Sequence, residues 1–332
     1  MKILVTGGSG FIGSNFIRHI ISKYKNYYII NLDKLTYSGN KDNLRDIENN
    51  ERYSFIQGDI CDEKITEEII KDIDVIVHFA AESHVTRSES QEGLFEKTNV
   101  EGTRNLLEIT SKYNKKFIHM STDEVYGSKK EGLFSEKDKI QGDSQATSPY
   151  AKSKARADDL VQSYSNKIET VIIRATNNFG SFQYPEKAMP RWITRLLKGE
   201  SIPVWGTGEN VRDWLYVGDT CKAIDLLLHK GKSGEIYNIA ANNNPEIKNI
   251  DLANIIVSYL NIDKSKIKLV SDPRPNHDLR YAIDCSKIKS LGWLSNENTI
   301  EQIHSTIDWY INNQIWWGKL TKEAESIYND IK

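Results

Sequence analysis

Three adjacent residues, Thr122-Asp123-Glu124, carry side chains suited to acid–base chemistry. The apolar residues 117–120 come before them and Gly127 follows, a pattern that predicts a buried strand opening into a loop at its carboxyl end. In open α/β sheets, ligands bind just beyond the carboxyl ends of the strands. We therefore expect the hydroxyl and the two carboxylates to face a ligand.

Tyr150 and Lys154 follow at a spacing of four residues, which places both side chains on one face of a helix. Next to a positively charged nicotinamide ring, such a tyrosine can take the proton of an alcohol. A free tyrosine titrates near pH 10, so a base at pH 7 needs a pKa lowered by roughly 3 units. The Lys154 ammonium and the nicotinamide cation would both favour the phenolate. Away from a cofactor, the same pair would be an ordinary solvated helix face.

The oxidation of an alcohol requires Tyr150 but has no need of Asp123 and Glu124. Two neighbouring carboxylates in a closed site can differ widely in pKa, so that one is a protonated acid and the other an ionised base. Such a pair suits the elimination of water, in which a base removes a proton next to a ketone and an acid protonates the departing hydroxyl. The alternative is a pair of surface carboxylates in a loop.

A cofactor site is expected at the N-terminus, where glycines 7, 8, 10 and 13 follow the apolar residues 2–6 and precede a helical pattern. Strand, glycine turn and helix form the dinucleotide fingerprint, in which the backbone approaches a pyrophosphate. Asp33 ends the next strand, and its carboxylate can accept hydrogen bonds from ribose hydroxyls while repelling a 2′-phosphate. We therefore expect NAD rather than NADP. Further along, Asp59 could meet the adenine, and Ala80 with Ala81 would let the cofactor lie close to the backbone.

Apolar runs of strand length alternate with helical patterns in the first half of the chain, and we expect strands at residues 2–6, 27–32, 53–57, 74–79, 117–121 and 169–174. This alternation predicts an α/β fold with a doubly wound parallel sheet of Rossmann type. Later loops rich in Pro, Gly and aromatic residues separate expected helices at 188–198, 219–230, 248–260 and 299–313. We expect an NAD-binding domain at 1–175, to which some later segments return, and a smaller C-terminal substrate lobe at 176–332.

The composition narrows the choice of partners. The 332 residues carry 44 basic and 46 acidic side chains, a balance that does not favour nucleic acid or an anionic membrane as a partner. The three cysteines, Cys61, Cys221 and Cys285, are isolated, so we expect neither disulfides nor a metal site. The N-terminal apolar run is too short for a signal peptide. We expect a cytoplasmic protein.

Several motifs resemble those of the extended short-chain dehydrogenase/reductase group and, within it, the dTDP-glucose 4,6-dehydratases. The most specific is the triplet at 122–124, because related 4-epimerases and sugar-nucleotide decarboxylases lack the adjacent carboxylates. The other matching motifs are the glycine turn and residues 33–37, 80–85, 148–150 with Lys154, 177–180, 185–187, 212–217 and 274–278.

This resemblance implies a cycle that converts dTDP-glucose to its 4-keto-6-deoxy product. Tyr150, helped by Thr122, takes the proton of the C4 hydroxyl while hydride passes to NAD⁺. Glu124 then removes the C5 proton, and Asp123 protonates the C6 hydroxyl as it leaves. Hydride returns to C6, Glu124 returns the proton to C5, and NAD is regenerated in place.

The resemblance also implies the residues of each part of the site. The catalytic residues would be Thr122, Asp123, Glu124, Tyr150 and Lys154. NAD would contact Gly7, Gly10, Phe11, Ile12, Gly13, Asp33, Lys34, Thr36, Asp59, Ile60, Ala80, Ala81, Ser83, Asn99, Tyr150 and Lys154. The nucleotide sugar would contact Ser83, His84, Thr122, Asn178, Lys187, Trp205, Arg212, Asn243, Arg274 and His277, with Trp205 stacking on the base.

Some alternatives stay open at this point. Thr86, Trp205 and Asn276 depart from the family pattern and leave dTDP or UDP as the nucleotide. A 4-epimerase would have no need of the two carboxylates, and a non-catalytic NAD-binding regulator would have lost the catalytic set, which is intact here. The family pattern also implies a homodimer formed through the helices expected at 94–112 and 150–165.

Overall fold

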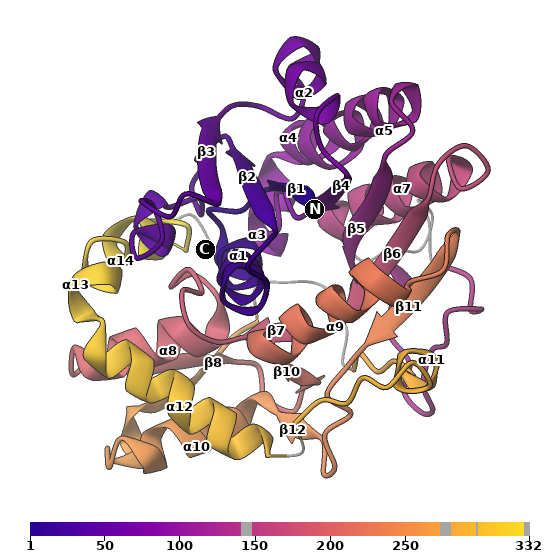
Figure 1. Cartoon of the computed structure of the whole chain (residues 1–332). Helices are drawn as coiled ribbons and strands as arrows, with labels where there is room; N and C mark the ends of the chain where they lie inside the picture. The colour runs from indigo at the N-terminus through magenta and orange to yellow at the C-terminus, as the bar shows by residue number, and fades with distance from the viewer. Residues whose placement is uncertain (141–147, 273–279, 297, 329–332) are drawn as a thin grey trace.

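The computed structural model describes residues 1–140, 148–272, 280–296 and 298–328. Its central element is a sheet of seven parallel strands in the order β11-β6-β5-β4-β1-β2-β3 (Figure 1). The strands are β1 (Lys2–Thr6), β2 (Tyr28–Asp33), β3 (Tyr53–Gln57), β4 (Val75–His78), β5 (Lys116–Thr122), β6 (Thr170–Ala175) and β11 (Glu235–Ile239). The predicted doubly wound parallel sheet is confirmed.

Alternate side chains of the central strands enter two separate cores. On β1, Ile3 and Val5 pack on one face of the sheet while Leu4 packs on the other, as the two-residue period of a strand requires. Both faces are therefore apolar, which is typical of parallel strands covered by helices on both sides. The first face is covered by α1 (Phe11–Lys23), α9 (Val217–Lys230) and α11 (Ser286–Lys289), and the second by α2 (Glu63–Ile70), α5 (Gly102–Lys112) and α7 (Pro149–Ser163).

The helix expected at 94–112 consists of three consecutive pieces. It begins with α4 (Glu92–Phe95), widens to a π-helix, η2 (Glu96–Glu101), and continues as α5. The π-helical turn carries Asn99, whose side chain hydrogen-bonds the backbone of Glu82 in a neighbouring loop. A wide turn of this kind often marks a position with a specific task. The short helix α3 (Val85–Ser90) follows that loop.

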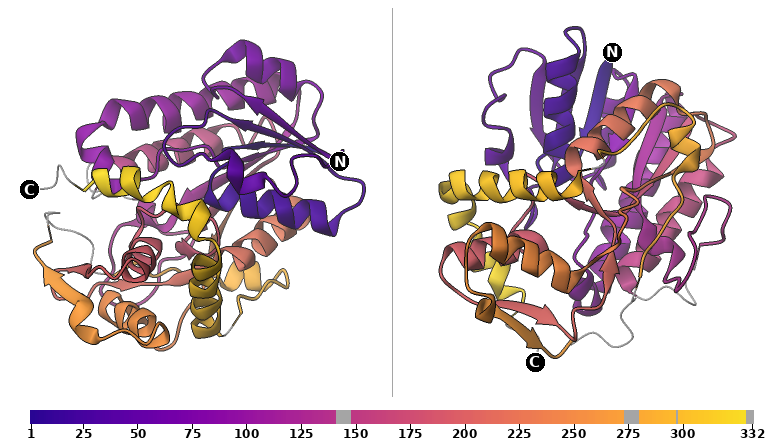
Figure 2. Two further views of the ribbon diagram at one scale, coloured as in Figure 1. Left: turned by 90° about the vertical axis from the view of Figure 1, so that its left-hand side faces the viewer. Right: turned by 90° about the horizontal axis from the view of Figure 1, so that it is seen from below.

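A third core holds the smaller lobe together. It includes Trp192, Val204, Ile256 and Ile307, which come from four different elements. The helices of this lobe are α8 (Ala188–Leu197), α10 (Asn249–Tyr259), α12 (Thr299–Asn312), α13 (Gln314–Gly318) and α14 (Thr321–Ser326). Three strand pairs accompany them: β7 (Asn177–Phe179) with β10 (Trp214–Tyr216), β9 (Val211–Arg212) with β12 (Ile247–Lys248), and β8 (Ile202–Trp205) with β13 (Ile267–Val270). Figure 2 shows this lobe beside the sheet.

The chain passes between the two parts more than once. After β10 it returns to the sheet, where α9 packs against α1 and β11 pairs in parallel with β6. Near the C-terminus the chain approaches the N-terminal segment again (Figure 1). There the Trp316 indole donates a 2.9 Å hydrogen bond to the side chain of Asn43 in the 3₁₀ helix η1 (Lys41–Leu44). Among the described residues, every helix is too short or too polar to cross a bilayer.

Candidate active site

A cleft of about 460 Å³ lies at the carboxyl ends of the central strands and is walled on its other side by the smaller lobe. It brings together residues from nearly the whole length of the chain, from Gly7 to Tyr328. The predicted residues that line it are Gly7, Gly10, Phe11, Ile12, Gly13, Asp33, Lys34, Thr36, Asp59, Ile60, Ala80, Ala81, Ser83, His84, Thr122, Asp123, Glu124, Tyr150, Lys154, Asn178, Lys187, Trp205 and Arg212.

The acid–base triplet lies where β5 ends and the 3₁₀ turn η3 (Asp123–Tyr126) begins. The Thr122 hydroxyl caps this turn by accepting a 3.3 Å hydrogen bond from the Glu124 amide, and it donates to Oδ1 of Asp123 at 3.1 Å. The Asp123 side chain is buried, and its Oδ2 has no hydrogen-bond partner among the described residues. A buried, unpartnered oxygen on a cleft wall is suited to receive a polar group of a ligand.

Asp123 is the protonated member of the carboxylate pair. Burial and the adjacent Glu124 carboxylate raise the pKa of Asp123 to about 8, while the hydrogen bond from Thr122 and the charge of Arg212 oppose this rise. At neutral pH, Asp123 therefore carries the proton that a general acid must donate. The prediction that Asp123 is the acid of the pair is consistent with this pKa.

Tyr150 and Lys154 lie on the first two turns of α7. Ser148 caps this helix by accepting a 3.1 Å hydrogen bond from the Ala151 amide, and Pro149 occupies its first position. The Lys154 ammonium donates to the Met120 carbonyl at 2.8 Å, so α7 is fastened to β5 directly beside the triplet. Both Tyr150 and Lys154 line the cleft.

The protein groups alone do not lower the pKa of Tyr150. Burial and the Glu124 carboxylate raise the pKa of this phenol, and the hydrogen bond with Thr122 opposes them only in part. The Lys154 ammonium is itself desolvated, and burial lowers its pKa to about 8 against the opposing charge of Asp158. Lowering the pKa of Tyr150 would require the nicotinamide cation in addition, and the joint role of this cation and Lys154 stays a prediction.

The glycine turn fits a dinucleotide. Gly7 has a φ of +71°, and a Cβ there would lie 2.6 Å from the Ala80 amide nitrogen. A Cβ on Gly13 would lie 2.4 Å from the Gly7 carbonyl oxygen. Neither position admits a side chain, so the bare backbone and the start of α1 form a surface that a pyrophosphate can approach.

Acidic residues stand where the adenosine ribose is expected. Asp33 ends β2 and accepts hydrogen bonds from the Ser9 amide at 2.9 Å and the Leu35 amide at 2.8 Å. These bonds fix the carboxylate at the cleft wall and leave each oxygen a second lone pair for a ribose hydroxyl. Lys34 and Asp59 form a 2.7 Å ion pair beside it.

No metal-binding group of three His, Cys, Asp or Glu side chains is found in the described ranges.

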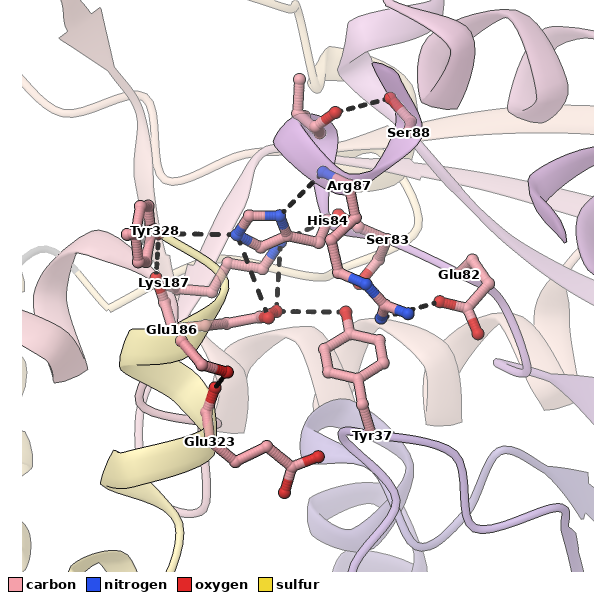
Figure 3. A network of polar contacts seen from close by, with 12 residues as sticks. Tyr37, Glu82, Ser83, His84, Arg87, Ser88, Glu186, Lys187, Glu323 and Tyr328 are labelled. Carbon is pink, nitrogen blue, oxygen red and sulfur yellow. Dashed lines mark hydrogen bonds and ion pairs between the residues drawn. The ribbon is translucent and has the colours of Figure 1, made fainter. Parts of the chain in front are cut away.

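The substrate side of the cleft is a polar network (Figure 3). The Lys187 ammonium donates to the Ser83 carbonyl at 2.8 Å, and His84 lies 3.9 Å from the buried Glu186 carboxylate. Farther along this side, the Arg212 guanidinium lies 4.5 Å from the centre of the Tyr281 ring. Arginine and lysine side chains match the oxygens of a diphosphate.

Two predicted contact residues lie behind the cleft wall. Asn99 bonds the amide and carbonyl of Glu82 at 2.9 and 3.0 Å and the Ser153 hydroxyl at 2.8 Å, so it holds the loop before α3 against α7. Asn243 donates to the Asp213 carboxylate at 2.8 Å, next to Arg212. Both are placed to position the residues in front of them. Arg274 and His277 lie outside the described residues.

Several residues that line the cleft were not predicted. Among them are Arg191, Trp192, Gln183, Tyr184, Glu186, Tyr281 and Tyr328. Glu186 stands in a motif that was recognised, directly before Lys187, and its burial raises its pKa although Lys187 opposes the rise. Tyr328 gave no local signal, because it reaches the cleft only through the packing of the C-terminal helices.

Comparisons with known proteins agree with this geometry. The family model described as GDP-mannose 4,6 dehydratase matches residues 4–306. The chain is 44% identical to dTDP-glucose 4,6-dehydratase of Escherichia coli, covering 96% of each protein. It is 41% identical to the low-salt glycan biosynthesis protein Agl12 of Haloferax volcanii, over 94% of this chain and 99% of that protein. The crystal structure of DesIV, a dTDP-glucose 4,6-dehydratase of Streptomyces venezuelae with NAD and TYD bound, is similar with a TM-score of 0.91 and 39% identity, over 96% of this chain and 100% of that one. The chain thus belongs to the nucleotide-sugar 4,6-dehydratase family, as its Thr-Asp-Glu triplet predicted.

Proposed function

We propose that this protein is an NAD-dependent dehydratase that converts dTDP-glucose to the 4-keto-6-deoxy sugar nucleotide. The observation that carries the proposal is the pair Asp123 and Glu124 in one cleft with Tyr150. Oxidation alone, or epimerisation, gives no task to a buried carboxylic acid that is protonated at neutral pH. The dTDP-glucose dehydratases similar to this chain supply the substrate class.

The chain's own residues carry out four proton transfers in this cycle, and exchange with solvent afterwards removes the proton that Tyr150 gained and restores the one that Asp123 gave. Tyr150, held by Thr122, takes the proton of the C4 hydroxyl, and bound NAD⁺ supplies the hydride acceptor that later returns the hydride to C6. Glu124 takes the C5 proton, which the neighbouring C4 ketone acidifies. Asp123 gives its proton to the C6 hydroxyl, which leaves as water, and Glu124 then returns a proton to C5. No net oxidation occurs, so the cofactor ends the cycle as it began.

The cofactor and the substrate are bound by different parts of the fold. We assign NAD binding to residues 1–175 together with α9 and β11, and substrate binding mainly to the rest of 176–332. The assignment is supported by the residues of the cleft, because the glycine turn and Asp33 come from the sheet while Lys187, Trp205 and Arg212 come from the smaller lobe.

A parallel incubation with dTDP-glucose, UDP-glucose and GDP-mannose tests the proposal. We expect dTDP-glucose to lose one water and gain a C6 methyl group, as seen by mass spectrometry and proton NMR. A product of unchanged mass with inverted C4 would identify a 4-epimerase instead. Preferred dehydration of UDP-glucose or GDP-mannose would show that the proposed nucleotide is wrong and that the proposed dehydration is right.

A homodimer in the cytoplasm completes the proposal. The helices proposed for the interface, α5 with its preceding turns and α7, already pack together on one face of the sheet, where Arg156 and Glu96 form a 2.6 Å ion pair. All three cysteines are free thiols, which suits a reducing compartment. Light scattering during size-exclusion chromatography should give twice the mass of one chain, and the mass of a single chain would refute the dimer.

A further inference from the structure

Glu325 fastens the helix α14 to the substrate side of the cleft. Glu325 accepts two hydrogen bonds from Arg191, at 3.0 and 2.8 Å, and one from Arg195 at 3.1 Å. Both arginines belong to α8, so the fork joins α14 to the helix that follows Lys187. A two-pronged arginine–carboxylate pair fixes orientation as well as distance. This pair therefore holds α14, and with it the nearby residue Tyr328, against α8.

Tyr328 is the residue that this fork positions. The Arg191 guanidinium lies 3.6 Å from the centre of the Tyr328 ring, so one side chain binds both Glu325 and the tyrosine. The Tyr328 hydroxyl donates to the Glu186 carbonyl oxygen and lies 3.5 Å from Nε2 of His84 (Figure 3). The two hydroxyl contacts connect Tyr328 to the polar network on the substrate side of the cleft.

The other side of Tyr328 meets Trp205. The two ring centres are 6.0 Å apart and the planes are inclined by 67°, and both residues line the cleft. Two aromatic rings at this angle form a corner in which a flat ring can stack on one and meet the edge of the other. Trp205 is the residue expected to stack on the base, so Tyr328 stands as the second wall of that site.

We propose that Tyr328 is a substrate-binding residue that links the recognition of the nucleobase to the placement of the sugar. Its ring bounds the base of a nucleoside diphosphate together with Trp205, and its hydroxyl holds the Glu186 backbone and His84. The C-terminal helix α14 thereby becomes part of the substrate site. The inference rests on the proposed nucleotide-sugar substrate and adds a residue outside the family motifs.

The two parts of Tyr328 can be separated by substitution. Tyr328→Ala removes the ring, and we expect the Kd of free dTDP to rise roughly tenfold, in the range measured for aromatic stacking on bases. Tyr328→Phe keeps the ring and removes the hydroxyl, so the Kd of dTDP should stay within about twofold while kcat/KM for dTDP-glucose falls about fivefold. A merely structural role would move both quantities together.

Two further variants distinguish a loss of nucleotide binding from a folding defect. Glu325→Gln keeps the size of the side chain but weakens the fork, so it should raise the Kd of dTDP in the same direction as Tyr328→Ala. Tyr259→Ala is the matched control, because Tyr259 stacks on His304 with ring centres 4.1 Å apart and does not line the cleft. Each protein is compared by thermal unfolding and by NAD content, which we expect to be unchanged.

The measurements are isothermal titrations with free dTDP, UDP and GDP and steady-state rates with dTDP-glucose. An unchanged Kd in Tyr328→Ala, or an equal change in Tyr259→Ala, overturns the inference. Failure of the wild-type protein to bind any of the three nucleotides overturns it as well. If the wild-type protein binds dTDP but forms no dehydrated product, the proposed function fails while the role of Tyr328 in nucleotide binding is still decided by the titrations.

Discussion

The Lys154 ammonium lies 3.3 Å from Nε2 of His119, and both side chains are buried between β5 and α7. An ammonium can only donate, so the histidine nitrogen is the acceptor. Burial and the charges of Lys154, His78 and Arg174 hold the pKa of His119 well below its usual value, so this imidazole is neutral and suited to accept. The histidine thus offers an acceptor to the ammonium of Lys154, the lysine that we propose to act in catalysis.

Replacing His119 should change the pH dependence of the oxidation step. His119→Phe keeps a ring but removes the acceptor, so the pKa of Lys154, about 8 in the wild-type protein, should fall further. Because charged Lys154 is the useful form, the rate is lost as pH rises through this pKa, and the loss should occur at lower pH in the variant. His119→Gln, which retains an acceptor, should resemble the wild type. The rate of C4 oxidation is followed against pH in a Glu124→Gln background, which removes the later proton transfers, and equal profiles for Phe and Gln would contradict the role.

Glu124→Gln should separate oxidation from elimination. Hydride transfer from C4 does not need this carboxylate, whereas removal of the C5 proton does. On mixing with dTDP-glucose, we expect the near-ultraviolet absorbance of reduced nicotinamide to accumulate without formation of the 6-deoxy product. Stopped-flow absorbance and quenched samples analysed by mass give the two readouts. Normal turnover of the variant would remove Glu124 from the role of C5 base.

Asp123→Asn tests the general acid. The amide keeps the size of the side chain but cannot donate the proton that a leaving hydroxyl requires, so dehydration should slow by about 10²–10⁴-fold. A 6-fluoro analogue should lose much less, because fluoride departs with less need of a proton. An equal loss with both substrates would mean that Asp123 orients the sugar and is not the acid.

Asp123→Asn should also stabilise the folded protein, increasingly so as the pH rises. The pKa of Asp123 rises from 3.8 in the unfolded chain to about 8 in the folded protein, so the folded state holds the proton more tightly. The free energy of unfolding therefore falls as the pH rises from about 4 to about 8. Above this range, the ionised Asp123 carboxylate destabilises the folded protein. Asparagine has no such titration, so the variant should become progressively more stable than the wild type between about pH 4 and pH 8. Urea unfolding at several pH values measures the difference, and a constant difference would rule out the raised pKa.

Asp33 should set the preference for NAD. Its carboxylate, fixed by the Ser9 and Leu35 amides, would face the 2′-phosphate of NADP and repel it. Asp33→Ser should reduce the ratio of NADP to NAD dissociation constants by roughly tenfold, which is about 1.4 kcal/mol. Asp46→Ser is the control, because Asp46 pairs with Arg18 and does not line the cleft. Comparable affinities for the two cofactors in the wild-type protein would disprove the assignment.

The sequence could predict those parts of the site that depend on local patterns, such as the end of a strand or the spacing of residues on a helix. The glycine turn follows directly on β1, Asp33 ends β2, and the triplet ends β5, so strand patterns place each at the same edge of the sheet. Tyr150 and Lys154 follow from helix spacing on α7. Sequence could not show that Asn99 and Asn243 lie behind the wall, because that depends on which loops pack in front of them. It also could not show Tyr328, whose position depends on an ion pair between α14 and α8.

One strand of the central sheet was missed for a related reason. β11 has the sequence Glu-Ile-Tyr-Asn-Ile, and three of its five residues are buried, so it lacks the continuous apolar run that marked the earlier strands. Its partner β6 is separated from it by the segments of the smaller lobe. A pairing across such a distance in sequence has no local signature, and the seventh strand emerges only from the folded protein.

The position of β11 also determines which fragments of this protein can fold. Every residue of β6 is buried, and its outer edge is paired with β11 from Val171 to Ala175. A fragment that ended at residue 175 would lack β11 and α9 and would present an unpaired apolar edge, which is a template for aggregation. The cofactor-binding half is therefore not a module that can be cut from the chain, and a transplant of it to another enzyme would have to carry the crossing through residues 176–216 as well.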